Sequence, residues 1–316
     1  MSIILNEIEK IEVISLQDNY VDLVNMDSTE VVQRAPMLAF ESKNSLIAEH
    51  GFSALVKLSN GDESRSMIFD FGFSEKGAVQ NADTLGLDLT SVEILVLSHG
   101  HMDHIGGLKD IAVRVGKKDL ALLTHPAVFR KRHIKLDEKT NIPLPPITKE
   151  RVLEAGVSLK ETKKPSLLFD NSLLFLGEVP RKTDYEKGIP NAFHTENNQE
   201  SHDAMSDDTA IIANVRGKGL VILSGCAHSG IINTIKYAQK ITGINKVFAV
   251  MGGFHLSGPF FEMIIEPTVK ALKEINPEYI IPTHCTGRNA VNFIEKEMPE
   301  QFLLNMVGTK MIFKAT

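Results

Sequence analysis

Short apolar runs recur along the chain, and each has the length of a β-strand rather than that of a long buried helix. Several of these runs end in glycine, aspartate or histidine, so polar side chains stand where the strands are expected to stop. The runs occupy residues 11–16, 53–58, 66–69, 94–97, 120–123, 172–176, 210–215, 219–224, 246–251, 279–282 and 311–313. This pattern predicts a sheet-rich protein with functional side chains at strand ends.

Apolar residues recur with a helical period in three segments, residues 230–242, 266–275 and 288–297. Pro277 and Pro299 stand just beyond the second and third segments, where a helix is expected to end. Two series of strands, each followed by helices, indicate two sheets packed face to face with helices outside them. We therefore expect an α+β fold, in the form of a four-layer αββα sandwich.

One segment, residues 129–208, differs from the rest of what we expect to be a single domain over residues 1–316. It is rich in proline and contains a polar stretch at residues 194–203. We expect an insertion near the mouth of a site, with little regular structure around residues 183–206. Loops of this length are often functional lids, and a solvated excursion is the alternative.

Composition and net charge limit the classes of protein to which the chain can belong. Hydrophobic residues make up 43% of the 316 residues and charged residues 23%, which is ordinary for a soluble globular chain. A net charge of −6 gives no drive toward nucleic acid or an anionic membrane. No apolar run approaches the roughly 18 residues of a membrane span, and residues 1–10 lack the features of a signal peptide. Two cysteines are too few for a disulfide scaffold, so a cytoplasmic location is expected.

The most informative segment follows the apolar run 94–97 and contains His99, His101, Asp103 and His104. The first two histidines can point to one side, while the carboxylate and the third histidine can face a second point nearby. Imidazole nitrogen with a carboxylate suits Zn²⁺, and also Mn²⁺ or Fe²⁺. We expect one or two metal ions per chain. Two ions about 3.5–4 Å apart would activate water or hold a phosphoryl or acyl group.

Six short motifs, in their order along the chain, are similar to those of the metallo-β-lactamase superfamily. They are EHGFS at 49–53, IFDFG at 68–72, LSHGH at 97–101, LSGCAHSG at 223–230, GGFHL at 252–256 and PTHCTG at 282–287. Together they resemble the branch that includes 7,8-dihydropterin-6-yl-methyl-4-(β-D-ribofuranosyl)aminobenzene-5′-phosphate synthase, a pterin-condensing enzyme. The resemblance implies the αββα fold and a metal-dependent enzyme.

Two further histidines, His228 and His284, follow apolar runs and are expected to complete the metal site. The sequence around His284 resembles that of the superfamily's last ligand. Many members carry a bridging aspartate where this chain has Cys226, and a histidine ligand well upstream of it. We expect His228 to replace that upstream histidine, in preference to His202, which lies in the polar stretch. Cys226 either supplies a thiolate to the metal or packs beside it.

Other residues are candidates for roles around the metal. His255 follows a strand-like run and two glycines, and it either binds metal, donates a proton to a leaving group or packs in the core. His50 either lines the pocket or belongs to a turn. Asp70 resembles the superfamily's aspartate that orients a metal-binding histidine, and Arg181 is a candidate for anion binding. The basic run 130–135 either attracts a phosphate-bearing substrate or forms a solvated helix face.

The resemblance implies a hydrolase or transferase that acts on a small molecule, with phosphorylated substrates among the candidates. In hydrolysis, metals would lower the pKa of a water toward 7. Asp103, the first predicted catalytic residue, would bind one metal and hold that water. In the pterin branch, an aryl ring attacks the carbon of a dihydropterin methyl pyrophosphate, and pyrophosphate leaves. His255 is the second predicted catalytic residue, as the proton donor.

Two other functional classes stay open. One is a non-catalytic protein that binds or senses a ligand through a metal, since a fold does not fix a function. The other is a nuclease-type phosphodiesterase, which the net charge of −6 and the absence of tryptophan disfavour. The sequence does not determine the oligomeric state.

Overall fold

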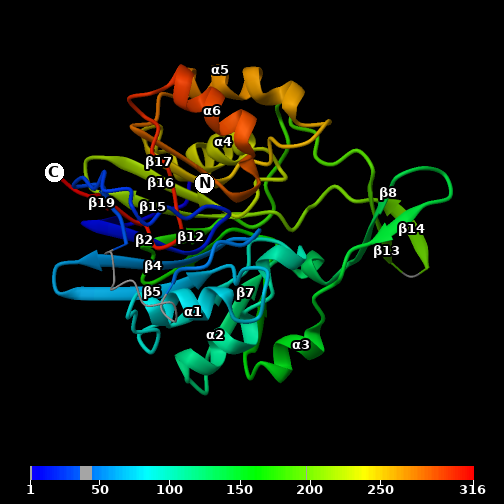
Figure 1. The fold of residues 1–316 in the computed structure, drawn as a ribbon, viewed down its shortest axis with the longest axis horizontal. Coiled ribbons are helices and arrows are strands. Elements are labelled where there is room, and N and C mark those ends of the chain that lie inside the picture. Colours follow the sequence, from blue (N-terminus) through cyan, green and yellow to red (C-terminus); the bar gives the residue numbers. More distant parts are fainter. Residues whose placement is uncertain (1, 36–44, 197) are drawn as a thin grey trace.

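The protein, seen in a computed structural model that describes residues 2–35, 45–196 and 198–316, has four layers. Two β-sheets are stacked in the middle, and helices cover the outer face of each sheet (Figure 1). The predicted α+β, αββα sandwich is therefore confirmed.

The first sheet carries most of the N-terminal half of the chain. Among the described residues its strand order is β10-β7-β6-β5-β4-β2-β19-β3. The strands are β2 (Lys10–Gln17), β3 (Val32–Gln33), β4 (Ser53–Asn60), β5 (Glu63–Phe69), β6 (Ile94–Val96), β7 (Ala121–Thr124), β10 (Ser158–Glu161) and β19 (Lys310–Lys314). Strands β5, β6 and β7 run parallel, so their C-terminal ends reach the same edge.

The second sheet carries most of the C-terminal half. Its order among the described residues is β11-β12-β15-β16-β17-β18, with β1 paired to β15. The strands are β1 (Glu7–Ile8), β11 (Ser166–Leu168), β12 (Leu173–Phe175), β15 (Ala210–Val215), β16 (Gly219–Ser224), β17 (Val247–Gly253) and β18 (Tyr279–Thr283). Strands β16, β17 and β18 are parallel and also end at one edge.

The main core lies between the two sheets. Side chains such as Val56 and Phe69 of the first sheet belong to one buried cluster with Ile211 and Val221 of the second. The alternate residues on the same strands, such as Ile68, are buried under the outer helices. Since both faces of these strands are buried, they read as continuous apolar runs. All eleven predicted runs accordingly contain a strand.

The helices form the two outer layers. They are α1 (Gly77–Thr84), α2 (Leu108–Val115), α3 (Lys149–Glu154), α4 (Ile231–Thr242), α5 (Ile265–Ile275) and α6 (Arg288–Glu297). The last three match the predicted helices and cover the second sheet, whereas α1 and α2 cover the first (Figure 1). The longest, α4, has 12 residues, and no helix in the described ranges has the length and hydrophobicity of a membrane span.

A third, smaller sheet stands beside the sandwich, at the right of Figure 1. Its strands, in the order β14-β13-β8-β9, are β8 (Lys131–Lys135), β9 (Asn141–Pro143), β13 (Ala192–Glu196) and β14 (Gln199–His202). We call it the outer sheet. The expectation of little regular structure around residues 183–206 is therefore wrong. The segment 129–208 is also not one insertion, because β10, β11 and β12 join the two main sheets; a lid function stays a prediction.

Candidate metal centre

The predicted ligands lie in loops that follow strand ends in both main sheets. The first four follow β6, and the short 3₁₀ helix η2 (Met102–His104) holds two of them. Cys226 and His228 follow β16, His255 follows β17, and His284 follows β18. Contacts between these loops bring residues more than 120 positions apart into one cluster.

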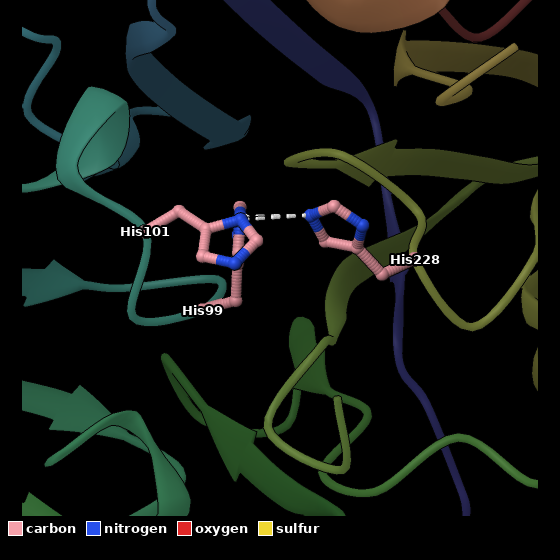
Figure 2. Close-up of side chains that lie close together, drawn as sticks. All are labelled: His99, His101 and His228. Atoms are coloured by element: carbon pink, nitrogen blue, oxygen red, sulfur yellow. Dashed lines mark hydrogen bonds between the residues drawn. The ribbon is translucent and has the colours of Figure 1, made fainter. Parts of the chain in front are cut away.

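The imidazoles of His99, His101 and His228 form the first group of donors. The His228 Nε2 atom lies 3.2 Å from His99 Nε2 and 3.1 Å from His101 Nδ1. Figure 2 shows the three rings turned toward one another from two different loops. In a tetrahedral zinc site, Zn–N bonds of about 2.0–2.1 Å place ligand nitrogens about 3.3–3.4 Å apart. The two separations from His228 thus match those between ligands of one ion, and ligand atoms of all three residues lie within 4.8 Å of one another.

The chemistry of this group fits a metal. Burial, with the nearby imidazoles, holds the pKa values of His99 and His228 well below the ordinary value. Burial and the Arg132 charge lower the pKa of His101 to about 4. All three rings are therefore neutral at pH 7, which is the form that binds a metal ion. His101 Nε2 and His228 Nδ1 are buried and have no hydrogen-bond partner among the described residues.

Asp103, His104 and His284 form the second group of donors. The Asp103 Oδ2 atom lies 3.0 Å from His284 Nε2 and 3.9 Å from His104 Nε2. The Cys226 Sγ atom lies 3.1 Å from His104 Nε2. It also lies within 4.8 Å of ligand atoms of His99 and, separately, of His228. Cys226 therefore stands between the two groups of donors.

The ring of His104 is held by Asp70, which is fully buried at the end of β5. His104 Nδ1 donates to Asp70 Oδ2 at 2.6 Å, which leaves Nε2 directed at the donor cluster. Both carboxylate oxygens also accept from Ser98, one from its backbone N–H and one from its hydroxyl. Asp70 thus has the contacts expected of a residue that orients a metal-binding histidine.

The ring of His284 is held in the same way by neighbours that the sequence did not reveal. His284 Nδ1 donates to Asn19 Oδ1 at 3.1 Å, and its backbone N–H donates to buried Asp18 at 2.9 Å. His50 is largely exposed, and its Nε2 lies 3.4 Å from Asp103 Oδ2. His50 therefore borders the second group from the solvent side.

In the second group the carboxylate of Asp103 lies close to the ring of His104, and each shifts the pKa of the other. Burial raises the pKa of Asp103, but His104 and hydrogen bonds from His284 and His50 outweigh it and hold this pKa well below the ordinary value. Burial lowers the pKa of His104, yet the charges of Asp70 and Asp103 raise it to about 9. In the metal-free protein His104 is therefore protonated at neutral pH, and a metal ion bound there must displace that proton.

The backbone at the site is strained. Asp70, Ala227, His255 and His284 have positive φ angles of 59°, 52°, 45° and 43°. Non-glycine residues held in such conformations cost about 1–3 kcal/mol each and cluster at functional sites. All four follow strand ends that carry or support the donor groups.

His255 lies between the first group and a pocket. Its ring centroid is 4.2 Å from that of His228 and 4.5 Å from that of Phe261. Its Nδ1 is buried and has no hydrogen-bond partner in the described part of the chain. The pocket has a volume of about 210 Å³, and Phe254 and Phe260 are among the residues that line it. A substrate in this pocket would contact His255 and the metal group together.

Three other expectations from the sequence concern Arg181, His202 and the basic run 130–135. Arg181 Nη2 donates to the backbone carbonyl of His228 at 3.1 Å, so Arg181 lies behind a donor loop, and anion binding by it stays a prediction. His202 is exposed in the outer sheet and bonds to the Ile189 carbonyl, away from every donor group found among the described residues. The basic run 130–135 forms strand β8, so a solvated helix face is wrong.

The site also depends on a buried ion-pair network that sequence reasoning missed. Arg132 of β8 donates to Asp203 at 2.6 Å and to Asp207 at 2.5 Å. The other oxygen of Asp207 accepts from the N–H of Gly100, which lies between His99 and His101. Gly100 has no room for a side chain, because a Cβ atom would lie 2.3 Å from the Val128 carbonyl oxygen. Asp203 and Asp207 precede the apolar run 210–215, and nothing in the sequence around them indicates that they pair with Arg132.

Asp207→Ala should weaken zinc binding by about 10–100-fold, the usual cost of losing a residue that supports a ligand. The variant leaves the Gly100 N–H without its acceptor and removes one counterion of buried Arg132. Competition with a chromophoric chelator measures the affinity directly.

Asp203→Ala is the matched control for this prediction. Asp203 pairs with the same guanidinium but does not contact Gly100. Both variants should lose stability, because each leaves buried charge poorly paired. Only Asp207→Ala should lose zinc affinity to the stated extent; equal affinities in the two variants would show that the Gly100 contact is not what positions the histidines.

Comparisons with known proteins agree with this geometry. A family model described as the metallo-beta-lactamase superfamily matches residues 48–165. The chain is 32% identical over 263 residues to 7,8-dihydropterin-6-methyl-4-(beta-D-ribofuranosyl)-aminobenzene-5′-phosphate synthase of Methanocaldococcus jannaschii, covering 81% of this chain and 87% of the relative. It is also 32% identical to an uncharacterised protein of the same organism, over 77% of this chain and 86% of that protein.

A solved structure extends the comparison to the whole fold. The crystal structure of Tm1679, described as a metal-dependent hydrolase of the beta-lactamase superfamily, aligns with a TM-score of 0.73. The alignment covers 96% of this chain and 100% of that chain, at 23% identity. With the shared fold, the matched motif region and the 32% identity to the synthase, this chain belongs to the metallo-β-lactamase superfamily and resembles its synthase branch.

Proposed function

We propose that this chain is a metal-dependent enzyme whose reaction takes place where the two donor groups meet. The observation that carries the proposal is the convergence of seven donor side chains from both main sheets. They are His99, His101, Asp103, His104, Cys226, His228 and His284. A structural zinc site is closed by four ligands. A larger cluster beside a pocket leaves positions for substrate, which supports catalysis rather than a purely structural role.

The two groups suggest how one or two ions would be held. His99, His101 and His228 would bind the first, and Asp103, His104 and His284 the second. The Cys226 thiolate would be shared between them, in place of the aspartate found in many relatives. Nitrogen and sulfur donors favour Zn²⁺, while the imidazole and carboxylate set also accommodates Mn²⁺ or Fe²⁺.

The chain's own residues define the chemistry around such ions. When bound, the metal supplies positive charge that neutralises a phosphoryl or acyl oxygen and lowers the pKa of water. His255, at the pocket wall, is placed to donate a proton to a leaving group. The apolar and aromatic lining of the pocket would hold an organic portion of the substrate and exclude water from it.

The named relative suggests the reaction class. It is described as a synthase that makes a dihydropterin-methyl-aminobenzene phosphate. We propose a condensation of the same class here, in which an aminobenzene nucleophile attacks the methyl carbon of a dihydropterin methyl pyrophosphate, and pyrophosphate and a proton leave. A second candidate is hydrolysis of a small phosphorylated or ester-like substrate. It is favoured by ionised Asp103, which is available to position a nucleophilic water.

A substrate panel with the zinc-, manganese- and iron-loaded protein tests this proposal. The panel contains a dihydropterin methyl pyrophosphate with an aminobenzene ribotide, phosphodiesters, lactones and β-lactams. Product that contains both rings would support the condensation, and turnover of one ester class would support the hydrolase. Absence of turnover across the panel, with metal bound, would favour the non-catalytic binding class; rapid cleavage of nucleic acid would favour the nuclease.

Metal removal should destabilise the protein. A ligand that binds only the folded state stabilises it by about 2.7 kcal/mol when its concentration is 100 times the dissociation constant. The protein should carry one to two metal equivalents, and a chelator should remove them with a clear fall in Tm. Elemental analysis and thermal melting measure the two effects. Reconstituted protein that holds less than about a tenth of an equivalent would refute the metal centre.

A further inference from the structure

The sequence has two cysteines, Cys226 and Cys285, and both lie at the candidate metal centre. They are 59 positions apart and come from different loops, one after β16 and the other in the 3₁₀ helix η5 (His284–Thr286). Two thiols scattered through 316 residues have no general reason to meet. Their contact beside the donor groups needs a chemical explanation. The role of a shared metal ligand explains the position of Cys226 but not that of Cys285.

The two thiols are close enough to react with each other. Their Sγ atoms lie within 4.8 Å of each other, in one group with the His284 ring. The Cys285 thiol lies 3.7 Å from the Cys226 carbonyl oxygen. A disulfide needs sulfurs about 2.05 Å apart. A change of χ1 rotamer moves a cysteine sulfur by up to about 3 Å, which is comparable to the gap between the two sulfurs.

Glycine at position 253 leaves free a space that borders both cysteines. A Cβ atom on Gly253 would lie 2.5 Å from Cys285 Sγ and 3.2 Å from Cys226 Cα. The same two distances place Cys285 Sγ less than 5.7 Å from Cys226 Cα, since 2.5 and 3.2 sum to that limit. Both cysteines therefore lie against Gly253 at the C-terminal end of β17.

We propose that Cys226 and Cys285 are a modification site, an oxidisable dithiol whose disulfide form releases metal. Cys285 is the less buried of the two residues, so we expect a peroxide to react with it first. The Cys285 thiolate attacks one peroxide oxygen, the O–O bond breaks, and a sulfenic acid and hydroxide form. The Cys226 thiol then gives up its proton as its sulfur attacks the Cys285 sulfur, and hydroxide leaves and is protonated to water. In sum, two thiols and hydrogen peroxide give one disulfide and two waters.

The Cys226 sulfur cannot be part of a disulfide and bind metal as a thiolate at the same time. A sulfur in a disulfide has no thiolate charge, so oxidation removes the donor that stands between the two groups. His104, which faces the Cys226 sulfur at 3.1 Å, loses that neighbour at the same time. This regulation rests on the proposed metal-dependent function, whereas formation of the disulfide itself does not.

The test uses the full-length protein, first reduced and stripped of metal, then treated with equimolar hydrogen peroxide and quenched with catalase. We expect both thiols to be lost together and the intact mass to fall by two hydrogen atoms. A non-reducing digest should contain the linked Cys226 and Cys285 peptides. Added dithiothreitol should restore both thiols. Oxygen addition to either cysteine without a cross-link, or links only between chains, would overturn the proposal.

Cys285→Ser is the matched variant, because it keeps Cys226 and the rest of the donor set. It should form no internal link under peroxide, while its folding is checked by circular dichroism. Zinc affinity of the wild-type disulfide form should be weaker by at least about 10–100-fold than that of the reduced form, and reduction should reverse the loss. An unchanged affinity after oxidation would overturn metal release. Failure of the reduced protein to bind metal would instead overturn the proposed function.

Discussion

His101→Ala and His284→Ala should each weaken metal binding by at least about 100-fold, although 183 positions separate the two residues in the sequence. The structure places them in the two donor groups, with His101 3.1 Å from His228 and His284 3.0 Å from Asp103. Each substitution removes a direct donor, which costs more than loss of a supporting residue. Elemental analysis after dialysis, with isothermal titration of zinc, measures both effects.

His202→Ala is the control for this pair. His202 is an exposed histidine whose Nε2 bonds to a backbone carbonyl in the outer sheet. Its replacement should leave metal content unchanged. Full metal uptake by either His101→Ala or His284→Ala would show that the residue is not a ligand and that the two-group arrangement is wrong.

His255→Asn should lower turnover by about 10²–10⁴-fold while metal content stays at the wild-type level. Asparagine is preferred to alanine here because it tolerates the left-handed backbone that His255 adopts, with φ of 45°. It cannot transfer a proton at neutral pH. The rate is measured on the substrate that the panel identifies, and a pH profile shows whether one ionisation has disappeared.

The two measurements separate three roles for His255. Loss of metal in parallel with loss of rate would make His255 a ligand, which its place within 4.8 Å of Cys226 and His228 donor atoms permits. Unchanged rate and unchanged metal content would show that His255 is only a packed core residue. Phe261→Leu, which alters the ring that packs on His255 but leaves the imidazole, provides a control for changes in the pocket wall.

The main strands were predictable because burial on both faces makes their sequences continuously apolar. The helices that prediction missed show the limit of that signal. Helix α1 buries Gly77, Ala78, Asn81 and Ala82, and Asn81 is held there by hydrogen bonds to backbone carbonyls rather than by apolar contact. Helix α2 buries residues at helical spacing, but its eight residues are shorter than the window in which periodicity is reliable.

The outer sheet was not predictable for a different reason. Strand β14 is exposed along its length, and β13 has two exposed residues at its end. Strand β13 is held by pairing with β8, about 60 positions earlier in the chain, and β14 pairs with β13. Polar strands of this kind show no alternation of apolar and polar residues, so their sequences predict a loop.

The candidate site also has one part that the sequence predicts and another that it does not. The donor cluster after β6 is visible in the sequence because four candidate ligands lie within six residues, and the strand ends point to His228, His255 and His284. The residues that hold these ligands in place, such as Asp18 for His284 and Asp207 for the Gly100 turn, act across more than 100 positions. A single sequence contains no signal for such pairings, since each looks like an ordinary polar loop residue.

The Arg132 network sets a rule for anyone who shortens this enzyme. Deleting the outer sheet would appear harmless, since most of its surface faces solvent. The deletion would, however, remove the guanidinium that neutralises Asp203 and Asp207 and leave two buried carboxylates beside the histidine turn. A minimal version should therefore keep Arg132 on a short bridging hairpin, or replace Asp203 with a neutral residue while retaining an acceptor at position 207 for Gly100.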